Sequence, residues 1–217
     1  MQIPLFPLRT VLFPGMALPL RIFEERYRIM VRELLDSGGS FGVILIREGN
    51  EVGGGAIPYK VGTLARIESC TETGRGRFNI TARGVQRFRL TRMLDPRPYP
   101  FGEVEPIEDA LPYASRHLDA ALETVRATFP VYFRLALSLT DQWARGLKLP
   151  ADPHQLVDFV GPWLQADEET RQRLLEPETA ADRVAQLAEV IDDLLSRTRE
   201  EALEHRRRKF EAPGIQN

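Results

Sequence analysis

The sequence predicts an α+β protein: a small, partly closed β barrel with one helix, followed by an α-helical bundle with a long last helix. Residues 1–110 combine Gly and Pro with short alternating apolar segments, which is typical of strands and turns. Residues 111–217 are rich in Ala, Leu, Glu and Arg at helical spacing. We therefore expect two subdomains, 1–110 and 111–217.

The first half should contain one helix, because apolar residues recur at helical spacing and Gly38 follows where a left-handed residue favours helix termination. The apolar stripe comprises Phe23, Tyr27, Met30, Val31, Leu34 and Leu35. Strands are expected over residues 41–46, 60–70, 77–83 and 87–91. Alternation is clearest from Phe78 to Ala82, so these strands should cover a core with one face and meet solvent with the other.

The second half shows helix signals in order. Its first apolar stripe comprises Leu118, Ala121, Leu122, Val125 and Phe129. Asp152, which precedes Pro153, and Asp167 are expected to cap two shorter helices. The last helix should span residues 178–209, with a seam of Val184, Leu187, Ile191, Leu194, Leu195 and Ala202. The basic residues at its C-terminal end interact favourably with the helix dipole, so they do not require a ligand to explain them.

The net charge and the residue composition exclude several classes of protein. A net charge of −2 provides no global attraction to nucleic acid or membrane. No apolar stretch is long enough to span a bilayer, and the proline-rich start does not resemble a signal peptide. A single cysteine, Cys70, fits a reducing compartment, so we expect a cytoplasmic protein. One Cys and three scattered His form no metal site, and we expect no cofactor.

Catalytic motifs are also missing from the expected contexts. No Lys follows a Gly, which excludes a P-loop. Residues 38–42 match the Gly-x-Ser-x-Gly pattern of hydrolases, but here a helix precedes and a strand follows, the reverse of a nucleophile elbow. We interpret these glycines as a turn and keep a Ser40 hydrolase as an alternative. No residue is assigned a catalytic role.

One segment is locally basic. Residues 60–97 contain nine cations against three acids. Arg75, Arg77, Arg87 and Arg89 define a possible nucleic-acid-binding face, with Arg87 and Arg89 on one exposed strand face. Aromatic residues interleave poorly there, so stacking platforms for RNA are missing and nucleic acid is not the expected partner. The competing interpretation is a solvated face that pairs with acids of the helical half.

Several segments resemble the N-terminal, substrate-binding domain of Lon proteases. They are residues 3–16 (IPLFPLRTVLFPGM), 18–20 (LPL), 62–67 (GTLARI), 78–88 (FNITARGVQRF), 149–159, 171–176 (RQRLLE) and 183–184. The resemblance implies a PUA-like pseudo-barrel followed by a helical bundle. It also implies a module that catches unfolded or tagged proteins for proteolysis or quality control. Because the sequence stops at Asn217, before the ATPase and peptidase of Lon, we expect a non-enzymatic, stand-alone form.

A peptide-binding groove is expected between the two subdomains. Pro14 and Pro19 stiffen the segment 10–20, and Pro100 stiffens a second aromatic segment near the junction. Aromatic and Met walls suit adaptable binding of apolar peptides. The candidate contacts are Phe13, Met16, Arg21, Tyr99 and Phe101. The seam of the last helix leaves open whether the chain forms a homo-oligomer.

Overall fold

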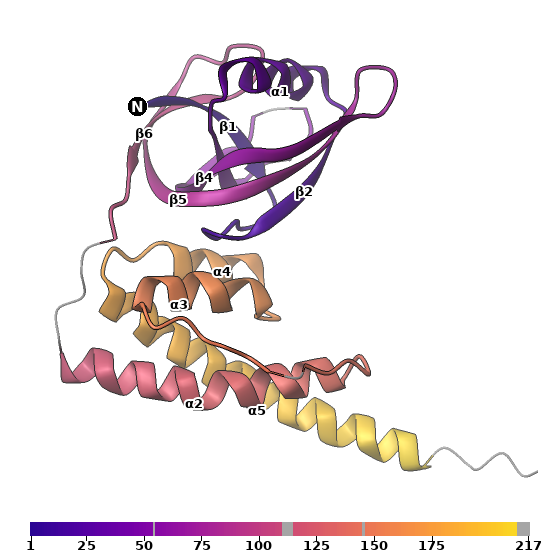
Figure 1. The fold of residues 1–217 in the computed structure, drawn as a ribbon, viewed down its shortest axis with the longest axis vertical. Helices are drawn as coiled ribbons and strands as arrows, with labels where there is room; N and C mark the ends of the chain where they lie inside the picture. The colour runs from indigo at the N-terminus through magenta and orange to yellow at the C-terminus, as the bar shows by residue number, and fades with distance from the viewer. Residues whose placement is uncertain (54, 110–114, 145, 212–217) are drawn as a thin grey trace, which may run out of the picture. The chain divides into compact units, whose positions relative to one another are not determined.

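The computed structural model describes residues 1–53, 55–109, 115–144 and 146–211 (Figure 1). The chain divides into two compact units. The first, here called the β unit, comprises Met1–Ala110 and Asp167–Glu178. The second, the helical unit, comprises Leu111–Ala166 and Thr179–Asn217. The segment 167–178, which the sequence placed with the helical half, is thus part of the β unit.

A six-stranded mixed sheet forms the β unit, and its strand order is β2-β5-β4-β3-β1-β6. Its strands are β1 (Gln2–Leu8), β2 (Ala17–Ile22), β3 (Phe41–Glu48), β4 (Ile57–Glu72), β5 (Phe78–Leu94) and β6 (Phe101–Pro106). β1 and β3 pair in parallel, and the other pairs are antiparallel. Because β5 also pairs with β6, five strands close into a ring and β2 remains at an edge.

Helix α1 (Glu25–Ser37) covers part of this curved sheet, as Figure 1 shows. It buries Tyr27, Met30, Val31 and Leu34 in the same core as residues from β1, β3 and β5. Gly38 ends the helix in the left-handed conformation, at φ 65°, as predicted. Phe23 and Leu35 were wrongly placed on the buried face: their exposed fractions are 58% and 46%.

Strand β5 replaces two strands predicted on either side of Gly84. A side chain at residue 84 would meet the main-chain oxygen of Phe13, 2.3 Å from an added Cβ, so glycine lets these backbones approach. The register of β4 against β5 shifts at this place, between Leu64 and Ala65. Gly84 therefore marks a bulge within one long strand. β1 and β6 were not predicted.

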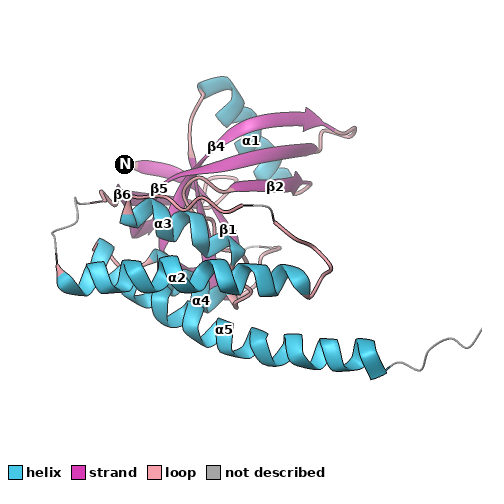
Figure 2. Ribbon diagram, turned by 60° about the horizontal axis from the view of Figure 1, so that its bottom comes forward, coloured by secondary structure: helices cyan, strands magenta, loops and turns pink. Residues whose placement is uncertain are grey.

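The helical unit contains α2 (Arg116–Ser138), α3 (Pro153–Val160), a short 3-10 helix (Gly161–Trp163) and α5 (Ala180–Glu211). α2 and α5 run side by side (Figure 2). The predicted N-cap is confirmed, since the Asp152 side chain accepts from the Gln155 N–H at 2.8 Å. The α5 seam is buried from Val184 to Leu195. Across the described ranges, no helix combines the length and apolarity needed to cross a bilayer.

Helix α4 (Glu168–Leu175) lies against the sheet of the β unit. Asp167 caps it as predicted, accepting from the Thr170 N–H at 2.7 Å. The Glu168 carboxylate accepts from the Val11 N–H at 2.9 Å, and the Gln172 amide donates to the Val61 oxygen at 3.0 Å. These contacts with backbone far away in sequence explain why α4 belongs to the β unit.

Candidate functional site

The predicted aromatic contacts lie in the core of the β unit. Phe13, Tyr99 and Phe101 have exposed fractions of 0%, 4% and 9%. In this conformation their rings offer little surface to a docked chain. Met16 is half-buried and Arg21 is exposed. The prolines around these aromatic residues stiffen the backbone as expected, but they do so while the rings face inward.

A groove next to Tyr99 offers apolar surface instead. Its volume is 290 Å³, and we call it the proline groove. Residues of the end of β5 and the segment after it form one wall, while α1, β1 and the segment before β4 contribute the rest. The lining comprises Pro7, Arg26, Tyr27, Glu51, Gly55, Ala56, Met93, Leu94, Pro96, Pro98, Tyr99 and Pro100.

The proline wall is held in place from both sides. Pro96, Pro98 and Pro100 fix their own φ angles, which limits the freedom of this segment. The Pro100 oxygen accepts from the Leu5 N–H at 2.8 Å, and the Tyr99 hydroxyl donates to the Glu33 carboxylate of α1. The groove is therefore preorganised, which lowers the entropy lost when a ligand binds.

Polar groups occupy one side of the groove. The Arg26 guanidinium lies 4.5 Å from the centre of the Tyr27 ring and 2.9 Å from the Glu24 carboxylate. It also donates a hydrogen bond to the main-chain oxygen of Glu51 at 3.1 Å. Burial raises the pKa of Tyr27 to about 12, against the lowering effect of Arg26, so the phenol stays neutral well into the alkaline range. An apolar wall beside fixed polar groups can bind a short protein segment.

Met93 is the lining residue best suited to contact such a segment. Its exposed fraction is 42%, and its unbranched side chain can adapt to different apolar partners. Sequence patterns alone did not predict contacts at Met93, Leu94, Pro96 and Pro98. The signal that could have found them is the run of alternate prolines from residue 96 to residue 100, one residue after the apolar pair Met93–Leu94.

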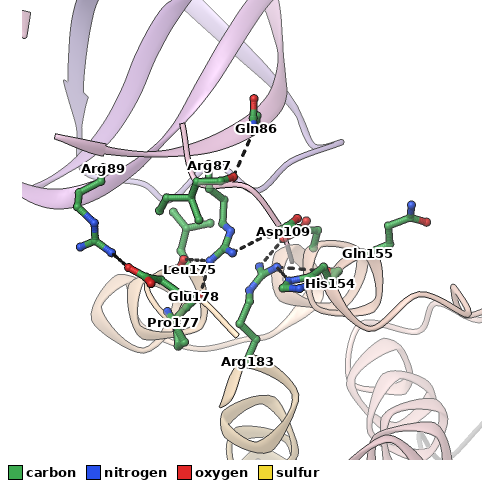
Figure 3. Close-up of polar contacts among 12 residues, drawn as sticks. Gln86, Arg87, Arg89, Asp109, His154, Gln155, Leu175, Pro177, Glu178 and Arg183 are labelled. Carbon is green, nitrogen blue, oxygen red and sulfur yellow. Dashed lines mark hydrogen bonds and ion pairs between the residues drawn. The ribbon is translucent and has the colours of Figure 1, made fainter. Parts of the chain in front are cut away.

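The predicted arginine face is not continuous. Arg87 was expected on an exposed strand face, but its exposed fraction is 1%. Its guanidinium donates to the oxygens of Leu175 and Pro177 and to Asp109, at 2.8, 2.5 and 2.7 Å (Figure 3). Arg89 pairs with Glu178 in the same view. The segment 167–178 covers Arg87, which strand alternation alone could not reveal, while Arg75 and Arg77 stay exposed.

Ser40 and Cys70 lie in surroundings that do not resemble catalytic centres. Ser40 follows α1 and precedes β3, and its Oγ accepts from Arg66 Nε at 3.4 Å. Arginine cannot take up the proton of a nucleophile. Burial, and to a lesser extent Glu72, raises the pKa of the Cys70 thiol. Among the described residues, no group of three or more His, Cys, Asp or Glu is placed to hold a metal ion.

The fold is shared with N-terminal domains of Lon proteins. A Lon N-terminal domain protein from Xanthomonas campestris superposes with a TM-score of 0.64 at 27% identity, over 86% of this chain and 96% of that one. The N-terminal domain of a Mycobacterium avium complex Lon protease also gives 0.64, at 19% identity, over 90% and 98% of the two chains. The second likeness concerns the fold alone. The α+β prediction is confirmed.

Sequence comparison defines the family. The model of the ATP-dependent protease La (LON) substrate-binding domain matches residues 2–193, and the chain belongs to this family. Lon protease of Syntrophus aciditrophicus is 24% identical over 198 residues, which is 89% of this chain and 25% of that protein. Lon protease 2 of Myxococcus xanthus is 26% identical over 200 residues, which is 91% of this chain and 24% of that protein. The chain thus spans about a quarter of these relatives.

Proposed function

We propose that this chain is a non-catalytic recognition module that binds unfolded or tagged protein segments in the proline groove. Membership of a substrate-binding domain family supports the general role. The observation that carries the specific site is the groove itself, a 290 Å³ space with a rigid proline wall and the exposed Met93. The named relatives are Lon proteases, so delivery of bound proteins for degradation is the setting we propose.

The apolar walls of the groove favour segments with apolar side chains, and its polar side favours segments with an extended backbone. Met93, Leu94 and the prolines offer apolar contacts that tolerate many sequences. The Arg26–Glu51 contact places polar atoms where the main chain of a bound segment can form hydrogen bonds. Such a site suits a module that meets many different unfolded chains.

The test measures affinity for a fluorescein-labelled, short, neutral peptide rich in Leu and Phe. Met93→Glu places a charge in the groove and should weaken binding roughly ten-fold, because a buried Met contributes about 1.5–3 kcal/mol. Val85→Glu is the matched control: Val85 is also exposed, at 47%, and lies on the same strand. At about 3.3 Å per residue, it lies roughly 26 Å along β5 from Met93.

Equal affinity of wild type, Met93→Glu and Val85→Glu would remove the groove as the binding site. A loss confined to Val85→Glu would move the site to the middle of β5. Circular dichroism of each variant verifies that the fold is retained.

A further inference from the structure

A second pocket of the β unit lies at the exposed edge strand, far along β5 from the proline groove. Its volume is 460 Å³. Arg21 of β2 is paired with Asn79 of β5, and Ile22 with Phe78. Side chains alternate along strands, so Arg21 and Asn79 share the outer face while Ile22 and Phe78 point into the core. The lining comprises Arg21, Ile22, Phe23, Thr73, Arg77, Phe78 and Asn79, and we call it the arginine pocket.

The two arginines of this pocket lack a side-chain partner within the part of the chain that the structure describes. Across the residues that the structure describes, the side chains of Arg21 and Arg77 make no hydrogen bond or ion pair. Several other arginines of the β unit do pair with a carboxylate: Arg26, Arg28, Arg83, Arg87, Arg89 and Arg92. Two neighbouring cations without acids repel each other, and an anion bound between them would relieve that repulsion.

The pocket is built on a fixed hairpin. The Thr73 N–H donates to the Arg77 oxygen at 2.8 Å, which closes the turn between β4 and β5. Arg28 Nε donates to the Gly76 oxygen at 2.6 Å, so α1 holds the turn. The Arg32 guanidinium lies 5.6 Å from the centre of the Phe78 ring. These contacts hold the backbone of the turn that carries Arg77, whose side chain lines the same pocket as Arg21.

The chemistry of the lining fits a carboxylate beside an apolar group. A guanidinium binds a carboxylate through two parallel N–H donors. Phe23 has an exposed fraction of 58% and offers apolar surface in the same pocket. Thr73 and Asn79 add neutral polar groups that can bind the main chain of a ligand.

A long polyanion fits this surface less well than a short acidic segment. The exposed Glu72 directly precedes the turn, the Glu25 carboxylate pairs with Arg28, and Glu68 pairs with Arg83 further along the sheet. Arg87 and Arg89 are engaged by internal partners, so these two arginines do not extend the basic surface along β5. Tracking of a nucleic-acid backbone requires an extended basic surface.

Strand addition at β2 is also disfavoured. The Gly84 N–H donates to the Met16 oxygen at 3.0 Å. In this antiparallel register, the main-chain N–H and C=O groups of residues 18, 20 and 22 then also point toward β5. The main-chain groups of Pro19 therefore point away from β5, toward the open edge. Because proline has no N–H, it cannot donate a hydrogen bond to an added strand there. Recognition at this edge has to rely on side chains.

We propose that Arg21 and Arg77 bind an acidic side chain of a protein segment whose neighbouring apolar residue packs on Phe23. This inference rests on the proposed function, for which it names a class of substrate: segments in which Asp or Glu stands next to an apolar residue.

The experiment titrates the full chain with three fluorescein-labelled probes of equal length. The first is a peptide alternating Glu with Leu, the second has every Glu replaced by Gln, and the third is oligouridylate. Arg21→Ala and Arg77→Ala should each weaken binding of the Glu peptide roughly ten-fold, since each removes a charge-assisted bond. Arg66→Ala, an exposed arginine of β4 outside the pocket, is the control and should bind as wild type does.

Unchanged affinity of both variants for the Glu peptide would overturn the inference. Binding of oligouridylate alone, lost in the same variants, would overturn it in favour of nucleic acid. The Gln peptide separates this inference from the proposed function. If Met93→Glu weakens its binding while the pocket variants leave both peptides unaffected, only the arginine pocket is wrong. If Met93→Glu has no effect while the pocket variants lose the Glu peptide, only the proline groove is wrong.

Discussion

The buried guanidinium of Arg87 donates to the carbonyl oxygen of Leu175, 2.8 Å away. This bond joins a central strand to the end of α4, two elements separated by most of the helical unit in sequence. A further bond to Pro177 and an ion pair with Asp109 hold the same guanidinium (Figure 3). Arg87 thus acts as a structural anchor of the segment 167–178.

Replacing Arg87 should release that segment. Arg87→Met leaves two carbonyl oxygens without their donor and should lower the free energy of unfolding by about 3 kcal/mol, measured by urea denaturation. Amide hydrogen exchange should accelerate over α4. Arg89→Met provides the contrast, because its pair with Glu178 is exposed and should contribute less than about 1 kcal/mol. Similar losses in both variants would contradict this role of Arg87.

Gly84→Ala tests the close approach of two backbones. An added Cβ would lie 2.3 Å from the Phe13 oxygen and 3.1 Å from Thr63, so one backbone has to move. We expect a loss of about 1–3 kcal/mol in thermal or urea unfolding. Gly146→Ala is the control, since its Cβ would meet no atom within 4 Å. A neutral Gly84→Ala would show that the bulge yields without strain.

Alkaline pH should destabilise the β unit through Tyr27. Burial raises its pKa from 10.0 to about 12 in the folded chain, so between these values only the unfolded state loses the proton. Stability is therefore fully present below pH 10 and declines as the pH rises toward 12. Tyr27→Phe should show a smaller decline in its urea midpoint over this range. Tyr99, whose pKa is also raised to about 12, mainly by burial, accounts for part of the remainder.

The helical unit contains a buried ion pair that a double-mutant cycle can test. Arg183 is fully buried, and its Nη2 lies 2.5 Å from the Asp158 carboxylate. Arg183→Met removes the charged partner of that buried carboxylate and should cost about 3–5 kcal/mol. Arg183→Met with Asp158→Leu removes both charges and should recover part of the loss in calorimetry. Additive effects of the two substitutions would show that the pair is not coupled.

Much of the fold could be predicted from local patterns. Gly38 and the capping residues Asp152 and Asp167 have short-range signals that the tertiary structure preserves. Strand β1 gave no such signal, because Pro4 and Pro7 interrupt its apolar run. The assignment of α4 to the β unit depends on contacts of Glu168 and Gln172 with distant backbone, which no local pattern contains.

The candidate sites were harder to predict, because exposure is a tertiary property. Phe13 and Tyr99 follow or precede prolines at turns, which suggested exposure, yet the core takes up both rings. Phe23 has the spacing of a helix stripe, but it precedes α1 and alternates outward after Ile22 of β2. Arg21 and Arg77 were assigned to different hypotheses, since only strand pairing brings them into one pocket.

The most direct test of substrate recognition maps backbone amide shifts by NMR while an unlabelled, neutral Leu/Phe peptide is added. We predict that shifts concentrate at the amides of Met93, Leu94 and Tyr99 and of the facing Tyr27 and Ala56, which line the proline groove. Saturable shifts at another surface, with these amides unmoved, would contradict the proposal that the groove binds protein segments.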